Sequence, residues 1–357
     1  MKLDPQTDGP VIPRVFAALG WSPVQIRYIR GVLRVDTGDG VFALKKTAAE
    51  PAQLTFLHET LSQLKEKGYE HVLLPVKVKE EAPLFVEEEG SCWYVLPWYG
   101  EAAEKGDEVP LEELVRGLAQ LHKLSEPLLA DKKIPASAVA TSGLEGKTEA
   151  GDRLRQWREV AWGREYASPF EKAVLSHMDY LEKALHFSVE GWRKQKSTGE
   201  ALPRTTLVHG RLHPHNLLVG TSGWRWIDFD HAHVGSPVSD LAMFLRRFVP
   251  FDRDEVVDPF ALLKEYEAEY PLKAKEKKLL ALHLAYPEGP IRTISSYYAR
   301  PDRWEEAVAV RTLSEEMDRL RLFRDWVQSV WNTNKRQPQS QKQRQTASVR
   351  SSRRKNR

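Results

Sequence analysis

The segment from residue 207 to residue 230, LVHGRLHPHNLLVGTSGWRWIDFD, limits the choice of fold more than any other part of the chain. Apolar residues ending at Val208 predict a short strand, and a polar loop runs from His209 to Asn216. A hairpin pattern follows and ends in Asp228-Phe229-Asp230. The segment therefore predicts two short strand-like runs between stretches of helical pattern.

The first hundred residues predict strands and one helix. The run VLRVDTGDGVFALKK alternates apolar and polar residues around Gly38-Asp39-Gly40, which predicts a β-hairpin. Between Pro51 and Lys67 leucines recur at helical spacing, and Gly68 ends the predicted helix. Three short runs rich in branched and aromatic residues follow, HVLLPVKV, APLFVEE and CWYVLPWY, and we expect these to add strands.

From Leu111 onward the pattern becomes helical. The run LEELVRGLAQLHKL places its leucines on one side of a helix, residues 154–194 predict two more helices, and residues 240–330 are helical again. These patterns predict an α+β fold. Its small β-rich lobe spans residues 1–96, a connector spans 97–100, and a large helical lobe spans 101–332.

The 207–230 segment resembles the catalytic loop of the phosphotransferase family that includes aminoglycoside and choline kinases. That loop reads His-Gly-Asp, four residues, Asn, and the residues of this chain in step with it are His209, Gly210, Leu212, His213, Pro214 and Asn216. The family's metal motif, IDFD or IDWE, matches residues 227–230. The resemblance implies a bilobal protein-kinase-like fold, a catalytic loop at 209–216 and a metal motif at 228–230.

The same resemblance implies roles for individual side chains. Asn216 and Asp228 would hold Mg²⁺, since amide and carboxylate oxygens are the hard ligands that this ion prefers. The downstream run GSPVSDLAMFL matches the family's G-x-P-x-x-D-L-A element, in which Asp240 would cap a helix and brace the catalytic loop. His209 and His213 would belong to the catalytic loop itself. ATP and Mg²⁺ are the cofactors that this arrangement implies.

The small lobe carries matching features for a nucleotide. Lys45, in the run FALKK, resembles the family's phosphate-contacting lysine, and Glu59 in the next helix would be its ion-pair partner. Lys46 is the competing choice, but strand alternation places Ala43 and Lys45 on one face and Lys46 on the other. The nucleotide-covering loop offers only Gly31, in IRGVLRV, where protein kinases carry several glycines.

Arg211 departs from the family pattern, because it occupies the position of the catalytic aspartate. Arginine stays charged and offers only donors, so it cannot accept the proton of a substrate hydroxyl. It can instead grip a phosphate, or pair with acidic residues such as Asp228 and fill the site. A neutral imidazole is a chemically capable base, and His213 and His215 are the candidates in the loop.

Four further segments narrow the resemblance to the CotS-type spore-coat proteins of endospore-forming bacteria, which include the YsxE and YutH groups. The segments are FLHETLSQLKEKGYEHVLLPV, WYVLPWYGEAAE, LAQLHKLS and LAYPEGPIRTISSYYARPDRW, although Pro290 and Ile291 replace a Phe-Trp pair in the last. The resemblance runs from about residue 25 to about residue 330. It implies synthesis in the cytoplasm, a place in the developing forespore or spore coat, and coat proteins as partners. It supplies no small-molecule acceptor.

Charge is unevenly distributed. From Lys335 to Arg357 there are nine basic and no acidic residues, so the rest of the chain has six more acidic than basic residues. Residues 333–357 predict a disordered tail, which is either a solubilising extension or an electrostatic tether to an anionic partner. No pattern predicts specific nucleic-acid binding. Apolar stretches of membrane-spanning or signal-peptide type are missing from the sequence.

Three functions remain open from the sequence. The first is a scaffolding pseudokinase of the spore coat, in which Arg211 marks an inactive site. The second is an active small-molecule or protein kinase with an unusual base. The third is another ATP-dependent modification, such as nucleotidyl transfer. The single cysteine, Cys92, excludes an intrachain disulfide and any cysteine-based metal cluster.

Overall fold

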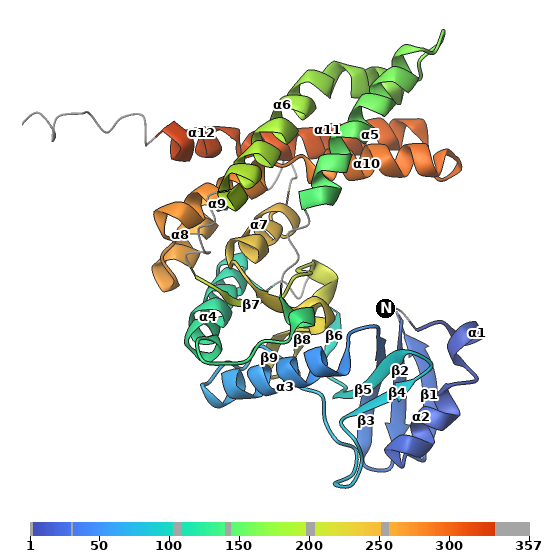
Figure 1. Cartoon of the computed structure of the whole chain (residues 1–357). Helices are drawn as coiled ribbons and strands as arrows, with labels where there is room; N and C mark the ends of the chain where they lie inside the picture. The colour runs from blue at the N-terminus through green and yellow to red at the C-terminus, as the bar shows by residue number, and fades with distance from the viewer. Residues whose placement is uncertain are drawn as a thin grey trace, which may run out of the picture. The chain divides into compact units, whose positions relative to one another are not determined.

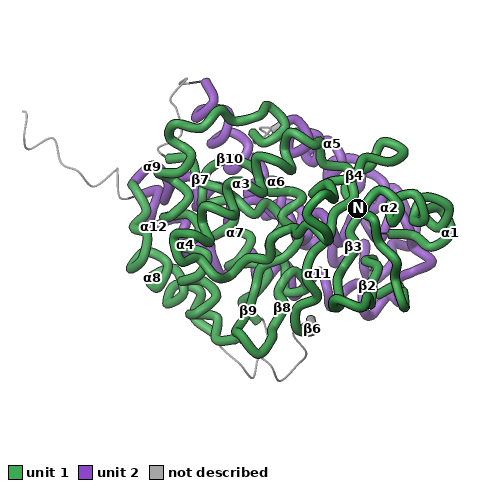
Figure 2. The backbone as a smooth tube through the Cα atoms, turned by 90° about the horizontal axis from the view of Figure 1, so that it is seen from below, with its two compact units in different colours: residues 1–142, 201–273 green, residues 143–200, 274–357 purple. Residues whose placement is uncertain are grey.

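The computed structural model describes residues 3–29, 31–102, 109–139, 144–197, 204–250 and 257–332. The chain divides into two compact units, one formed by residues 1–142 and 201–273 and the other by residues 143–200 and 274–357 (Figure 2). The first unit contains both the predicted small lobe and the whole 207–230 segment. Every predicted site residue therefore lies in the first unit. The basic tail, residues 333–357, lies outside the described residues.

The first unit is built on a five-stranded antiparallel sheet, as the fold prediction required (Figure 1). Its strands are β1 (Gln25–Ile29), β2 (Val32–Thr37), β3 (Gly40–Thr47), β4 (Phe85–Glu88) and β5 (Ser91–Pro97), in the spatial order β1-β2-β3-β5-β4. The predicted hairpin forms between β2 and β3. Lys45 is opposite Tyr94 and Lys46 is opposite Trp93, so alternation sends the two lysines to opposite faces.

Helices cover the sheet. The predicted helix forms as α3 (Pro51–Glu66). Two helices that the sequence analysis missed, α1 (Pro5–Asp8) and α2 (Ile12–Leu19), precede the sheet and lie beside it (Figure 1). Apolar residues of α2 share a buried cluster with Leu33, Leu44 and Trp93. Lys46 lies on this face and bonds to Asp8 at 2.6 Å, which leaves Lys45 for the other face.

The rest of the first unit surrounds the 207–230 segment with short strands and helices. A two-stranded pair joins β7 (Thr206–Val208) to β10 (His233–Gly235), and a three-stranded sheet has the order β6 (Glu101–Ala102), β8 (Leu217–Gly220), β9 (Gly223–Trp226). The helices are α4 (Leu111–Leu129), α7 (Val238–Arg247) and α8 (Pro259–Glu269). Trp224 and Trp226 of β9 are fully buried, so they form core.

The second unit is helical in its described part. Its elements are α5 (Leu144–Trp162), α6 (Pro169–Ser197), α9 (Ala274–Ala285), α10 (Glu288–Ala299), α11 (Glu306–Leu322) and α12 (Arg324–Asn332). Ser168 and Glu171 form a reciprocal capping box at the start of α6. Leu181, Ile294 and Leu313 belong to one buried cluster that joins α6, α10 and α11. Among the described residues, no helix is long and apolar enough to cross a membrane.

Candidate active site

Two antiparallel strand pairs position the candidate site. The loop 209–216 connects β7 to β8, and the motif 228–230 connects β9 to β10. Because β7 pairs with β10 and β8 pairs with β9, both ends of the loop are held beside both ends of the motif. The strand ladder thus brings together side chains that stand about twenty positions apart in the sequence.

Asp240 braces the loop from beneath. Its buried carboxylate accepts hydrogen bonds from the backbone N–H groups of His209 at 2.6 Å and Gly210 at 3.0 Å. Burial raises the pKa of Asp240, but the hydrogen bond from His122 and the nearby His209 lower it below its ordinary value. The cap predicted for Asp240 is not made, since the N-terminus of α7 has no side-chain cap and the carboxylate turns to the loop.

His122 is a site residue that the sequence analysis did not select. It lies in α4 within the run LAQLHKLS, is fully buried, and joins Asp240 at 3.4 Å to the Tyr266 hydroxyl at 2.7 Å. Three residues later, Ser125 accepts a hydrogen bond from the backbone of Leu207 in β7. The run LAQLHKLS therefore supports the loop through two separate contacts.

His209 has a positioning role in the structure. Its ring is fully buried, Nε2 donates to the Ile227 carbonyl at 2.9 Å, and Nδ1 accepts from the Arg211 backbone N–H at 3.3 Å. These two bonds require the neutral ring protonated on Nε2. Burial lowers the pKa of His209, consistent with that neutral form. His209 therefore ties the loop to the metal motif and faces away from solvent.

His213 and His215 lie on the outer side of the loop. Nδ1 of His213 accepts from the His215 backbone N–H at 3.1 Å, and the two ring centres are 4.7 Å apart. Both side chains are exposed. His213 therefore caps the short 3₁₀ turn that ends at Asn216.

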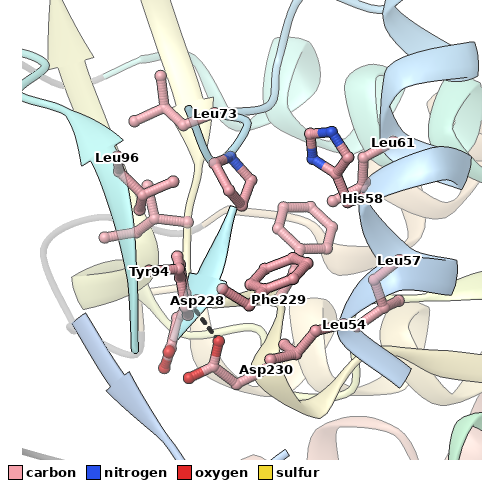
Figure 3. Close-up of a pocket in the computed structure, with 13 residues that line it drawn as sticks. Leu54, Leu57, His58, Leu61, Leu73, Tyr94, Leu96, Asp228, Phe229 and Asp230 are labelled. Atoms are coloured by element: carbon pink, nitrogen blue, oxygen red, sulfur yellow. Dashed lines mark hydrogen bonds between the residues drawn. The ribbon is translucent and has the colours of Figure 1, made fainter. Parts of the chain in front are cut away.

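Lys45 reaches the metal motif. Its ammonium lies 2.8 Å from Asp228 Oδ1 and 3.6 Å from Asp230 Oδ2. Tyr94 donates to the other oxygen of Asp230 at 2.5 Å (Figure 3). Burial lowers the pKa of Lys45, but Tyr94 and the two carboxylates outweigh it and raise the pKa above its ordinary value. Lys45 is thus a charged, buried partner of both aspartates.

The predicted ion pair between Lys45 and Glu59 is wrong. Glu59 is exposed, and the ion pairs of Lys45 within the described residues are with Asp228 and Asp230. Helix α3 instead turns His58 toward the interior, beside Leu57 and Leu61 (Figure 3). The physical reason is helical phase, since position 58 shares a face with the leucines at 54, 57 and 61 and position 59 does not.

Asp228 adopts a backbone conformation that aspartate tolerates but seldom takes. Its φ of 70° and ψ of 48° lie in the left-handed region. Burial raises the pKa of its carboxyl, but the positive charges of Lys45 and Arg211 lower it by more, so the net shift of the pKa is downward. The strained turn presents both oxygens of Asp228 to cations.

Arg211 closes the other side of Asp228. Its Nη1 lies 3.5 Å from Asp228 Oδ2 and donates to His231 Nε2 at 3.0 Å, while half of the side chain, 51%, stays exposed. Nε2 of His231 must be unprotonated to accept that bond, so the ring is neutral. Desolvation and the Arg211 charge both lower the pKa of His231. In the sequence, the only signal for His231 is its place directly after the 228–230 motif.

Asp228 is a poor fit to Mg²⁺ in this arrangement, because both of its oxygens face positive groups. The hydrogen bond of Asn216 uses its amide nitrogen, which donates to the Arg211 carbonyl at 2.9 Å, and leaves the amide oxygen as a potential metal ligand. Within the residues that the structure describes, no three His, Cys, Asp or Glu side chains are placed to share a metal ion. A cation would therefore have to compete with Lys45 and Arg211 for the same carboxylate.

Gly31 lies between β1 and β2 with a φ of 91°, and its carbonyl accepts from the Leu3 backbone N–H at 3.0 Å.

Behind the motif is a small cavity of about 40 Å³. That volume holds a few water molecules and is far too small for a nucleotide. It is lined by Leu54, Leu57, His58, Leu61, Leu73, Pro75, Phe85, Tyr94, Leu96, Ile227, Asp228, Phe229 and Asp230 (Figure 3).

Solved structures of kinases share this fold. The chain is similar to an aminoglycoside phosphotransferase from Alicyclobacillus acidocaldarius, with 18% identity, a TM-score of 0.68 and coverage of 87% of this chain and 92% of that one. It is also similar to amicoumacin kinase in complex with AMP-PNP and Ca²⁺, with 14% identity, a TM-score of 0.59 and coverage of 88% and 93%. At these identities the likeness establishes the fold.

Two sequence comparisons relate the chain to a curated protein and to a protein family. The chain is 27% identical over 180 residues to the endospore coat-associated protein YutH of Bacillus subtilis, which is 44% of this chain and 50% of YutH, so the match spans half the length of that relative. The model of the phosphotransferase enzyme family matches residues 21–273, a range that includes Lys45, the loop 209–216 and Asp240. This chain therefore belongs to the phosphotransferase enzyme family.

Proposed function

We propose that the chain is a catalytically atypical member of its family, a pseudokinase associated with the bacterial spore coat. One observation carries the proposal: Arg211, at the position of the catalytic aspartate, contacts Asp228 and His231. Phosphoryl transfer needs a group that orients or deprotonates the attacking hydroxyl. A guanidinium has no acceptor atom and stays protonated, so it cannot serve.

The surrounding framework supports a retained scaffold with altered chemistry. Asp240 and His209 hold the loop in place through buried hydrogen bonds, so its geometry does not depend on the side chain at position 211. The relation to YutH supports a place in the spore coat or developing forespore, with coat proteins as partners. The basic tail that follows residue 332 would suit an anionic partner in that assembly.

Phosphate release from Mg-ATP by the full-length protein tests this proposal. The wild type should release no more phosphate than a heat-denatured sample, both alone and with a panel of small alcohols and aminoglycosides. R211D restores a carboxylate at position 211, and D228N, made in the wild type and in R211D, removes the carboxylate of the 228–230 motif. Turnover by the wild type that D228N abolishes would refute a pseudokinase.

A second candidate function is an active phosphotransferase that uses His231 as its base. The observation that favours it is His231 Nε2, which lies 3.0 Å from the Arg211 group at the base position and becomes an open acceptor once Arg211 turns to a phosphate. His213 and His215 are less suited, because both rings are exposed on the outer side of the loop, whereas His231 contacts Arg211. If H231Q abolishes a transfer activity that H215Q retains, this alternative replaces the first.

A further inference from the structure

The four charged side chains at the centre of the site sum to zero. Lys45 and Arg211 are positive, and Asp228 and Asp230 are negative. The neighbouring His231 is neutral because it accepts a hydrogen bond from Arg211. An aspartate at position 211 would leave the same group with two net negative charges. One divalent cation neutralises two such charges, so the arginine supplies the charge that the cation would bring.

The donor geometry agrees with this count. Of the two Asp228 oxygens, Oδ1 bonds to Lys45 at 2.8 Å and Oδ2 faces Arg211 at 3.5 Å. The side-chain contacts of Arg211 within the described residues all use Nη1. Its Nε and Nη2 donors therefore remain for an incoming group, and 51% of the side chain is exposed to meet one. Two parallel N–H donors suit a phosphate oxygen pair.

We infer that Arg211 takes the place of a divalent metal, so that this site binds the phosphate groups of a nucleotide or pyrophosphate without Mg²⁺. The inference deepens the proposed function by naming the ligand class of the same site, and it rests on that proposal only for the absence of turnover. Lys45 neutralises Asp228 from the buried side, and Arg211 offers its free donors from the exposed side. Mg²⁺ would then add nothing, because the carboxylate it needs is already paired.

Calorimetric titration of the full chain tests this inference, with ADP, adenosine and inorganic pyrophosphate as probes, each in EDTA and in millimolar Mg²⁺. ADP should bind in EDTA, and Mg²⁺ should change its Kd by less than about threefold, while adenosine should bind at least about tenfold more weakly. Pyrophosphate that binds as tightly as ADP would identify the phosphates alone as the ligand. ADP that binds more tightly would add a role for the base, and both results support the inference.

Three variants make the test specific. R211Q keeps a polar side chain but removes the charge, and it should weaken binding in EDTA by about tenfold or more. R211D should abolish binding in EDTA and make it depend on Mg²⁺. R116Q is the matched control, since Arg116 is an equally exposed arginine of the same unit that pairs with Glu265 away from the site. Circular dichroism spectra would check that the variants fold.

Two outcomes would overturn the inference. Binding by the wild type only in Mg²⁺ would mean that the metal displaces Arg211 from Asp228 and holds the phosphates itself. Lack of binding for every probe, with and without Mg²⁺, would mean that the ion pairs fill the site. Neither result would restore activity, so the pseudokinase proposal would survive both. Conversely, phosphate release by the wild type would refute the pseudokinase proposal and leave metal-free binding to be judged by the titration.

Discussion

The buried and exposed halves of the loop 209–216 differ in the partners that their side chains meet. On the buried side, Asp240, His122 and His209 form a closed network in which each polar group meets a partner. On the exposed side, Arg211, which we place at the position of the family's catalytic aspartate, contacts His231 and Asp228. The difference teaches that the brace depends on backbone N–H groups and is indifferent to the side chain at position 211, so the chemistry can change while the loop stays in place.

Removal of the brace should have the largest effect. D240A would leave the backbone N–H groups of His209 and Gly210, and the ring of His122, without their acceptor inside the protein. We expect a loss of about 3–5 kcal/mol in the free energy of unfolding, since each buried unpaired group costs about 1–3 kcal/mol. Denaturant unfolding followed by intrinsic fluorescence would measure it.

The control for D240A is E269A, which removes one half of a largely exposed ion pair with Lys123 in the same unit. It should change the unfolding free energy by less than about 0.5–1 kcal/mol. Equal losses in the two variants would show that the buried half of the loop is no better anchored than the surface, and the comparison would fail.

G210A tests the turn between the two halves. Gly210 has a φ of 77°, and an added Cβ would lie 2.3 Å from the His231 carbonyl oxygen. We expect a loss of about 2–3 kcal/mol, because conformational strain of about 1 kcal/mol combines with a clash against rigid backbone. Thermal unfolding would measure the loss. G68A is a matched variant, since Gly68 has a φ of 87° with nothing within 4 Å, and it should lose only the strain.

The sequence predicted the scaffold better than the pairing within the site. Strand alternation indicated that Lys45 and Lys46 face opposite ways, because side-chain direction in a strand is a local property. Helical phase was equally local, and the leucines of α3 could have indicated His58 in place of Glu59. By contrast, α1 has four residues and α2 has eight, so neither helix is long enough to show a clear helical period in the sequence.

His231 and His122 were beyond local reasoning. His231 meets Arg211 across 20 positions and His122 meets Asp240 across 118, and such pairings depend on how β7, β10, α4 and α7 assemble. The pairing of Asp228 with the side chains of Lys45 and Arg211 is likewise a property of the assembled site. A motif can therefore predict which residues gather there, and leaves open which of them pair.

His209 should contribute one part of the pH dependence of stability. The pKa of His209 is lowered in the folded protein, so folding opposes its protonation. Its contribution is complete above the unfolded pKa of about 6.5 and falls as the pH drops below it, by at most about 1.4 kcal/mol per pH unit. Unfolding free energies measured from about pH 7.5 to about pH 5 would show the fall. H209Q should reduce the slope, and the slope that remains should come from the other histidines with lowered pKa values, which are His58, His71, His177 and His231.

The smallest effect on stability should come from Arg211 itself. R211Q removes a half-exposed ion pair with Asp228 and one hydrogen bond to His231, and such contacts are worth at most about 1 kcal/mol. Because Lys45 still neutralises Asp228 from the buried side, no unpaired charge is left in the interior. The unfolding free energy should therefore stay within about 1 kcal/mol of the wild type, measured beside D240A under identical conditions. A loss as large as that of D240A would mean that Arg211 is part of the brace, and the division between a structural half and a chemically altered half would no longer hold.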